Sequence, residues 1–138
     1  MTTAYSGNAS IDLERVSLEL RAREPLFHHP EFGITRAELE EMITPDYWEV
    51  GASGKVYDRQ FVIDTIVARY EDPEYQGVNS GTEKDWTVED FNCAELSSGL
   101  YLVTYTLTQG ERVTRRTTIW TNKEKGFQAV YHQGTIVS

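Results

Sequence analysis

The sequence predicts an α+β fold, in which three N-terminal helices pack on a mainly antiparallel sheet. Two observations carry this prediction. Apolar residues recur at helical spacing in the first half of the chain, and β-rich runs fill residues 86–136. The breaks between these runs are short, as they are in antiparallel connections. Helices that come first and a long antiparallel sheet that follows are typical of a layered α+β domain.

The first helix is predicted to begin at Ser10 and to end near Pro25. Ser10 can cap the helix, and proline disfavours a helical conformation in the residue before it. Residues 1–9 are small and polar, so we expect a disordered tail there and a single folded domain over residues 10–138.

Capping residues also mark the second and third helices. Thr35 and Glu38 have the spacing of a capping box, which predicts a short helix that ends at Pro45. Asp58 is the expected N-cap of the third helix, whose apolar stripe includes Phe61 and Ile66.

The predicted sheet has one short strand before the third helix and four long strands after it. These are Tyr47–Val50, Trp86–Leu96, Leu100–Thr108, Val113–Thr121 and Phe127–Ile136. Both faces of Leu100–Thr108 carry bulky or β-branched side chains, whereas a strand with one wet face alternates apolar with charged residues. We therefore expect a second subunit to cover the outer face. The alternative is that the threonines face water and reflect strand propensity.

Composition excludes several classes of protein. The 138 residues carry 22 acidic and 13 basic side chains, and a net charge of −9 disfavours binding to nucleic acid or to anionic membranes. There is no apolar run of about 20 residues, the length that a membrane span needs. The N-terminus has neither the basic start nor the apolar core of a signal peptide, and the single cysteine, Cys93, cannot form an internal disulfide. We expect a cytoplasmic protein.

Two stretches of sequence point to a known superfamily. They are Thr44–Asp58, which precedes the third helix, and the last quarter, with Thr118-Ile-Trp120 and His132-Gln-Gly-Thr135. With the order of elements, they resemble the nuclear transport factor 2-like superfamily, which includes SnoaL-like cyclases and ketosteroid isomerases, and in particular an uncharacterised bacterial branch. The resemblance implies a cystatin-like cone with a curved sheet and a cavity that opens at one end. It does not imply one activity, because the superfamily hosts enzymes and non-catalytic modules alike.

The family's placement of polar groups suggests which residues line this cavity. By position we expect Glu49 and His132 as acid and base. The candidates for ligand binding are Arg116, Trp120, Tyr47, Tyr57, Trp48, Gln133 and Ser53. Tyr47 and Tyr57 are expected near the mouth.

The register of the last hairpin decides whether Arg116 and His132 meet. Pairing of Thr121 with Phe127 sets Arg116 opposite His132, whereas a slip of one residue pairs Arg116 with Tyr131. Under the first register Arg116 could hold an anionic ligand group or form a buried ion pair with Glu49 that only completes the core. His132 is the best acid–base candidate, although a histidine in a strand can also be a hydrogen-bonded wall residue.

Other motifs in the sequence do not predict a catalytic, metal or cofactor site. Gly51–Gly54 lacks the second glycine of a nucleophile elbow, because Lys55 occupies that position. His28 and His29 are expected in the turn after the first helix, where one of them could edge the cavity mouth. Because they are adjacent, they predict no metal site. No phosphate-binding or dinucleotide motif is present, and we expect no cofactor.

Three functions are consistent with the sequence. The first is a homodimer that binds a small, partly apolar organic molecule. The second is a cofactor-independent SnoaL-like lyase, isomerase or hydrolase that uses His132 and Glu49 as acid and base. The third is a non-catalytic dimerisation module.

Overall fold

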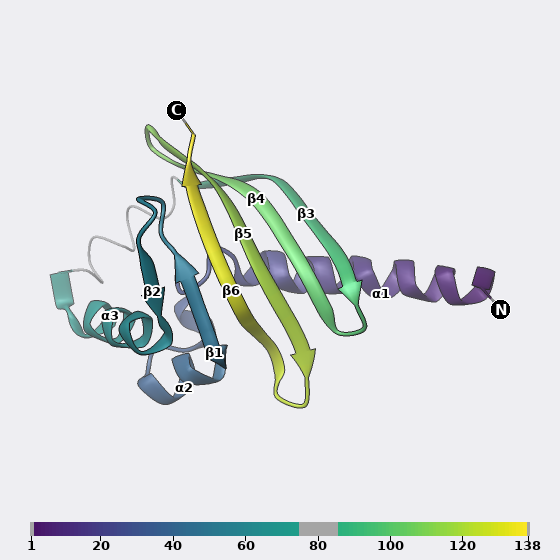
Figure 1. Cartoon of the computed structure of the whole chain (residues 1–138), viewed down its shortest axis with the longest axis horizontal. Coiled ribbons are helices and arrows are strands. Elements are labelled where there is room, and N and C mark those ends of the chain that lie inside the picture. The colour runs from purple at the N-terminus through teal and green to yellow at the C-terminus, as the bar shows by residue number, and fades with distance from the viewer. Residues whose placement is uncertain (1, 75–85, 138) are drawn as a thin grey trace.

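The part of the chain that the structure describes contains three α-helices and a six-stranded sheet (Figure 1). The computed structural model describes residues 2–74 and 86–137, and it describes side chains of the first helix from Asp12 onward. The helices are α1 (Thr2–Arg23), α2 (Arg36–Glu41) and α3 (Arg59–Glu71), with a 3-10 turn at Pro30–Phe32. The strands are β1 (Ile43–Val50), β2 (Val56–Asp58), β3 (Thr87–Ser97), β4 (Leu100–Gln109), β5 (Arg112–Lys123) and β6 (Gly126–Ile136). The α+β class is confirmed, but β1 and β2 lie between α2 and α3, so the helices are not one N-terminal block.

Helix α1 begins at Thr2 and not at Ser10, so residues 2–9 are helical and not the expected tail. No proline interrupts this stretch, and serine at position 10 is tolerated inside a helix at a small cost in free energy. The C-terminal end agrees with the prediction, because α1 stops at Arg23, two positions before Pro25. None of the helices that the structure describes is long and apolar enough to cross a bilayer.

The other two helices have the predicted caps. The Thr35 hydroxyl accepts a hydrogen bond from the Glu38 backbone N–H at 3.3 Å, and the Glu38 carboxylate accepts one from the Thr35 N–H at 3.1 Å. At α3, the Asp58 carboxylate accepts from the Phe61 N–H at 2.8 Å. α2 is shorter than expected and ends before Pro45, which lies within β1.

The strands run in the order β2-β1-β6-β5-β4-β3. All neighbours are antiparallel except β1 and β6, which are parallel. The parallel contact puts the short strand from between the helices beside the last strand of the chain. Residues that are distant in sequence, Glu49 of β1 and His132 of β6, are therefore register partners.

One face of the sheet packs against the helices and forms the core. The alternating residues of β4 that were expected on one face are buried there: Tyr101, Val103, Tyr105 and Leu107. Helix α1 contributes Leu20, and α3 contributes Val62, Ile63 and Ile66. We call this side the inner face and the opposite side the outer face.

Candidate functional site

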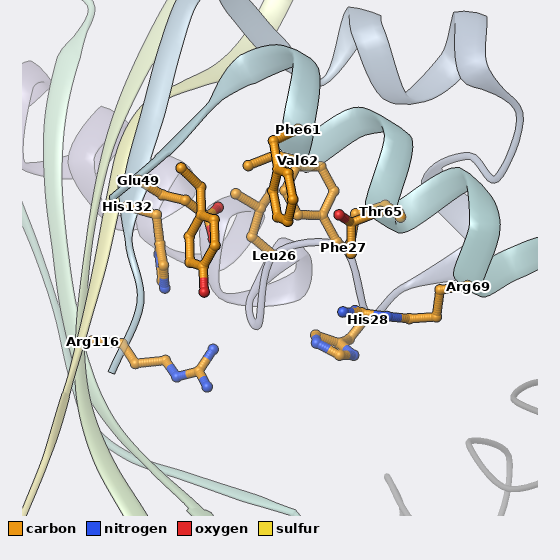
Figure 2. A pocket seen from close by; sticks show the side chains of 12 residues that line it. Leu26, Phe27, His28, Glu49, Phe61, Val62, Thr65, Arg69, Arg116 and His132 are labelled. Carbon is orange, nitrogen blue, oxygen red and sulfur yellow. The ribbon is translucent and has the colours of Figure 1, made fainter. Parts of the chain in front are cut away.

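A cavity of about 380 Å³ lies between α3, the segment after α1 and the inner face of the sheet (Figure 2). Its lining comes from three places. The sheet contributes Glu49, Tyr57, Arg116 and His132; α3 contributes Phe61, Val62, Thr65, Ile66 and Arg69; and the segment after α1 contributes Leu26, Phe27 and His28. A cavity of this size is within the range of small-molecule sites, about 300–1,000 Å³.

The hairpin register differs from both predicted registers. Arg116 faces Gly134, and Thr118 faces His132. Asn122 pairs with Phe127 at the turn. The register then shifts between Ile119 and Trp120, so Val130 has no register partner and Ala129, opposite Trp120, is buried. Because the error at Arg116 is two residues and side chains alternate with a period of two, Arg116 and His132 still share the inner face.

Among the described residues, Glu49 is the single carboxyl group of the cavity lining. Its Oε1 accepts a hydrogen bond of 2.6 Å from the Tyr47 hydroxyl. Burial raises the pKa of Glu49 from its usual 4.5, against the opposing effects of the Tyr47 hydrogen bond and of the Arg116 and Arg69 charges. The predicted ion pair is wrong: among the described residues, Arg116 and Glu49 do not come within 4.0 Å.

His132 is a buried, neutral hydrogen-bonding group. Its Nδ1 lies 2.7 Å from the hydroxyl of Thr118, a fully buried residue. Burial, followed by the charge of Arg116 and by His28, lowers the pKa of His132 to about 3. The ring is therefore uncharged at neutral pH, so one ring nitrogen donates and the other accepts: Nε2 accepts if Nδ1 donates to Thr118, and donates if Nδ1 accepts from it.

Trp120 and Tyr47 lie deeper than predicted. Both are 1% exposed and lie outside the cavity lining, so Tyr47 is not at the mouth; it reaches the cavity only through its bond to Glu49. Tyr57 agrees better with the prediction, since it lines the cavity and stacks on the half-exposed ring of Phe61 at 5.0 Å.

Three of the predicted ligand-binding residues lie elsewhere. Trp48 and Gln133 are exposed on the outer face, because each is adjacent in its strand to an inward residue, Glu49 or His132. Ser53 is exposed in the turn between β1 and β2.

Sequence analysis missed a buried carboxyl group at Glu24, which is 2% exposed. Its Oε1 accepts from the Tyr105 hydroxyl at 2.7 Å and from the Leu26 N–H at 3.1 Å, and its Oε2 accepts from Trp120 Nε1 at 3.0 Å. These bonds fasten the segment after α1 to the sheet. No sequence signal separates this glutamate from the exposed acids of the preceding helix α1.

Two cavity residues were also unassigned by the sequence. Arg69 lies in the last turn of α3, where a basic side chain is common. His28 was expected in the turn after α1, with one of the two adjacent histidines at the edge of the cavity mouth. It lines the cavity and lies against Trp86, with ring centroids 4.9 Å apart, and its pKa is lowered to about 3, mainly by burial. No cluster of three or more histidine, cysteine, aspartate or glutamate side chains that could hold a metal occurs in the part of the chain that is described.

Comparison with known proteins identifies the fold of this chain. No protein-family model and no curated protein matches the sequence. Among solved structures, a putative dehydratase of the NTF2-like family from Streptomyces avermitilis superposes with a TM-score of 0.66 at 17% identity, covering 94% of this chain and 99% of that one. A DUF3225-family protein of unknown function from Pectobacterium atrosepticum gives 0.65 at 16% identity, with 91% of each chain covered.

A third structure, a protein with a cystatin-like fold from Caulobacter vibrioides, gives a TM-score of 0.57 at 15% identity, covering 93% of this chain and 89% of that one. At these identities the similarity concerns the fold and not the activity. The expected resemblance is confirmed at that level: the chain has the cystatin-like fold of NTF2-like proteins.

Proposed function

We propose that the protein binds a small, partly apolar organic molecule in the cavity between α3 and the inner face. One observation supports this proposal most directly. Leu26, Phe61 and Val62 form an apolar wall of the cavity, and this wall faces the polar groups of Glu49 and His132. Sites for small molecules combine these two features, because the apolar wall supplies binding energy and a few polar groups orient the ligand.

The test is to identify small molecules released from the purified protein by mass spectrometry. Thr65→Trp should fill the cavity from α3 and abolish the released species, since Thr65 lines it. Ala68→Trp is the matched control, because Ala68 is exposed on the same helix and lies outside the lining. Equal release from both variants would place the molecule elsewhere.

A second candidate is proton transfer to or from a bound substrate, as in a lyase, isomerase or hydrolase. It is favoured by the raised pKa of Glu49, because a carboxyl group with a pKa closer to neutrality is a better general acid or base. In this scheme Glu49 moves the proton. His132, with its pKa near 3, only donates or accepts a hydrogen bond.

NMR in D₂O can separate the two candidates once the released molecule is identified. Catalysis predicts that the wild type alters this molecule or exchanges its C–H protons, and that Glu49→Gln does neither while remaining folded. A molecule that the wild type leaves unchanged supports binding alone.

We also propose that two copies pack through their outer faces. A row of side chains crosses five neighbouring strands on this side, because register partners share a face: Ala94, Leu102, Ile119, Tyr131 and Trp48. Trp48 is 44% exposed and contacts the Tyr131 ring, with centroids 4.7 Å apart. A continuous apolar row of this kind is typical of a subunit interface.

Sedimentation at micromolar concentration tests the dimer. The wild type should sediment at twice 15.8 kDa. Ile119→Arg should dissociate it, whereas Val56→Arg, at an exposed position on edge strand β2, should not. A wild-type monomer would remove the proposal. A dimer that releases no small molecule would favour a pure dimerisation module instead.

A further inference from the structure

One end of the cavity carries positive charge. Arg116 reaches it from β5 and Arg69 from α3, and Figure 2 shows both guanidinium groups directed to the same open space, with the His28 ring beside Arg69. The two arginines come from opposite walls. Arginine pairs placed in this way suit a planar anion, because each guanidinium presents a fork of N–H donors.

Arg116 is held in place by a neutral partner. Its Nε donates to the Thr114 hydroxyl at 3.0 Å. Thr114 is fully buried, so its hydrogen bond restricts the Arg116 side chain. Within the described residues no carboxylate forms an ion pair with Arg116. Its positive charge is therefore not neutralised by a described acidic side chain.

The cavity differs in charge from the rest of the protein. The whole chain carries −9, but among the described residues the cavity lining holds two arginines and one carboxyl group, that of Glu49. Its two histidines add no charge at neutral pH, because burial and the arginine charges lower the pKa of each to about 3. An acidic protein thus has an internal site that attracts anions.

The other end of the cavity is apolar. Leu26, Phe27, Phe61 and Val62 lie together there, away from the two guanidinium groups (Figure 2). A ligand that fits both ends has a charged head and an apolar body.

The surroundings favour a singly charged head. Arg69 lies in the last turn of α3, and the C-terminal end of a helix carries partial negative charge. Phosphate sites are more often built on helix N-termini, where the backbone N–H groups and the dipole both favour a multiply charged anion.

We propose that the ligand of this cavity is a small organic acid, with its carboxylate bound by Arg116 and Arg69 and its apolar body against Leu26, Phe61 and Val62. This inference rests on the proposed binding function and names the class of ligand. No covalent step is involved.

The test compares acids with their neutral amides on the wild-type protein. Isothermal titration calorimetry is run with benzoate, phenylacetate, 3-phenylpropanoate and 4-phenylbutanoate, each beside its amide, and with inorganic phosphate and sulfate. At least one acid should bind about tenfold or more tightly than its amide, because charge-assisted hydrogen bonds are about twice as strong as neutral ones. Phosphate and sulfate should compete weakly or not at all.

Variants locate the effect. Arg116→Gln and Arg69→Gln should each remove most of the preference for the acid, and Arg115→Gln should not, because Arg115 is exposed and adjacent in β5 to the inward Arg116. Circular dichroism checks that each variant is folded, and the acid–amide comparison needs no variant at all.

Each result decides between the two proposals. Amides that bind as tightly as their acids, with no effect of Arg116→Gln, would overturn the organic-acid inference and leave the binding function standing. Phosphate that binds more tightly than every acid would also overturn it. If no acid and no amide binds at millimolar concentration, the organic-acid inference fails, and the binding function is decided by the mass spectrometry of released molecules.

Discussion

Replacement of Glu24 should be among the most destabilising single changes in this protein. Its carboxyl group accepts hydrogen bonds from three buried donors: Tyr105, Leu26 and Trp120. A buried donor without an acceptor costs about 1–3 kcal/mol, so Glu24→Ala should lower the free energy of unfolding by about 3–9 kcal/mol. Typical domains are stable by only about 5–15 kcal/mol, and Glu24→Ala could therefore unfold the chain.

Glu24→Gln gives a measurement when the alanine variant does not fold. The amide keeps one oxygen for Tyr105 and Leu26 but turns its NH₂ toward the Trp120 N–H, so the expected loss is about 1–3 kcal/mol. Urea unfolding followed by circular dichroism measures both variants, with Glu14→Ala, at an exposed position of α1, as the control within about 0.5 kcal/mol of the wild type. A loss below about 1 kcal/mol for Glu24→Ala would refute the assigned network.

Three further predictions concern other parts of the molecule. Folding lowers the pKa values of His28 and His132 from 6.5 to about 3, so between these pH values the folded state binds fewer protons than the unfolded state. The free energy of unfolding should therefore be highest above pH 6.5 and decline as the pH falls, and the decline should be less steep in His132→Asn. Urea unfolding at several pH values measures this. Thr35→Ala removes an N-cap and should cost about 1 kcal/mol in urea unfolding, with Thr135→Ala as an exposed control. Tyr47→Phe removes the hydrogen bond that lowers the pKa of Glu49, so this pKa should rise further in ¹³C NMR titration, and an unchanged value would contradict the 2.6 Å contact.

The order of elements could be predicted from sequence because its signals are local. Caps such as Thr35 and Asp58 act within one turn, and the strand runs alternate along their own length. The start of α1 could not be predicted in this way, since the stretch before Ser10 includes Gly7, a residue of low helix propensity, and yet is helical.

The site was only partly predictable because its geometry depends on pairing. Glu49, Arg116 and His132 were expected on the inner face, and alternation keeps them there even though the predicted register was wrong by two residues. The same alternation excludes Trp48 and Gln133, which the family's general pattern could not separate from their inward neighbours. The positions of Arg69 and Glu24 depend on tertiary packing, and no local pattern in the sequence marks these two residues.

Glu24, which bonds to the inner face, and Glu49, which lies on it, are carboxyl groups in different situations, and the difference bears on function. Glu24 accepts from three donors, whereas Glu49 accepts from Tyr47 alone among the described residues. A raised pKa means that folding disfavours the charged form of Glu49, so its ionisation lowers stability as the pH rises from 4.5 through the folded value. Glu49→Gln should therefore be at least as stable as the wild type at pH 7, with any gain disappearing below pH 4.5, in contrast to Glu24→Gln. If urea unfolding instead shows that Glu49→Gln is as damaging as Glu24→Gln, Glu49 belongs to the structural core; a stable variant that loses ligand binding assigns Glu49 to the working site.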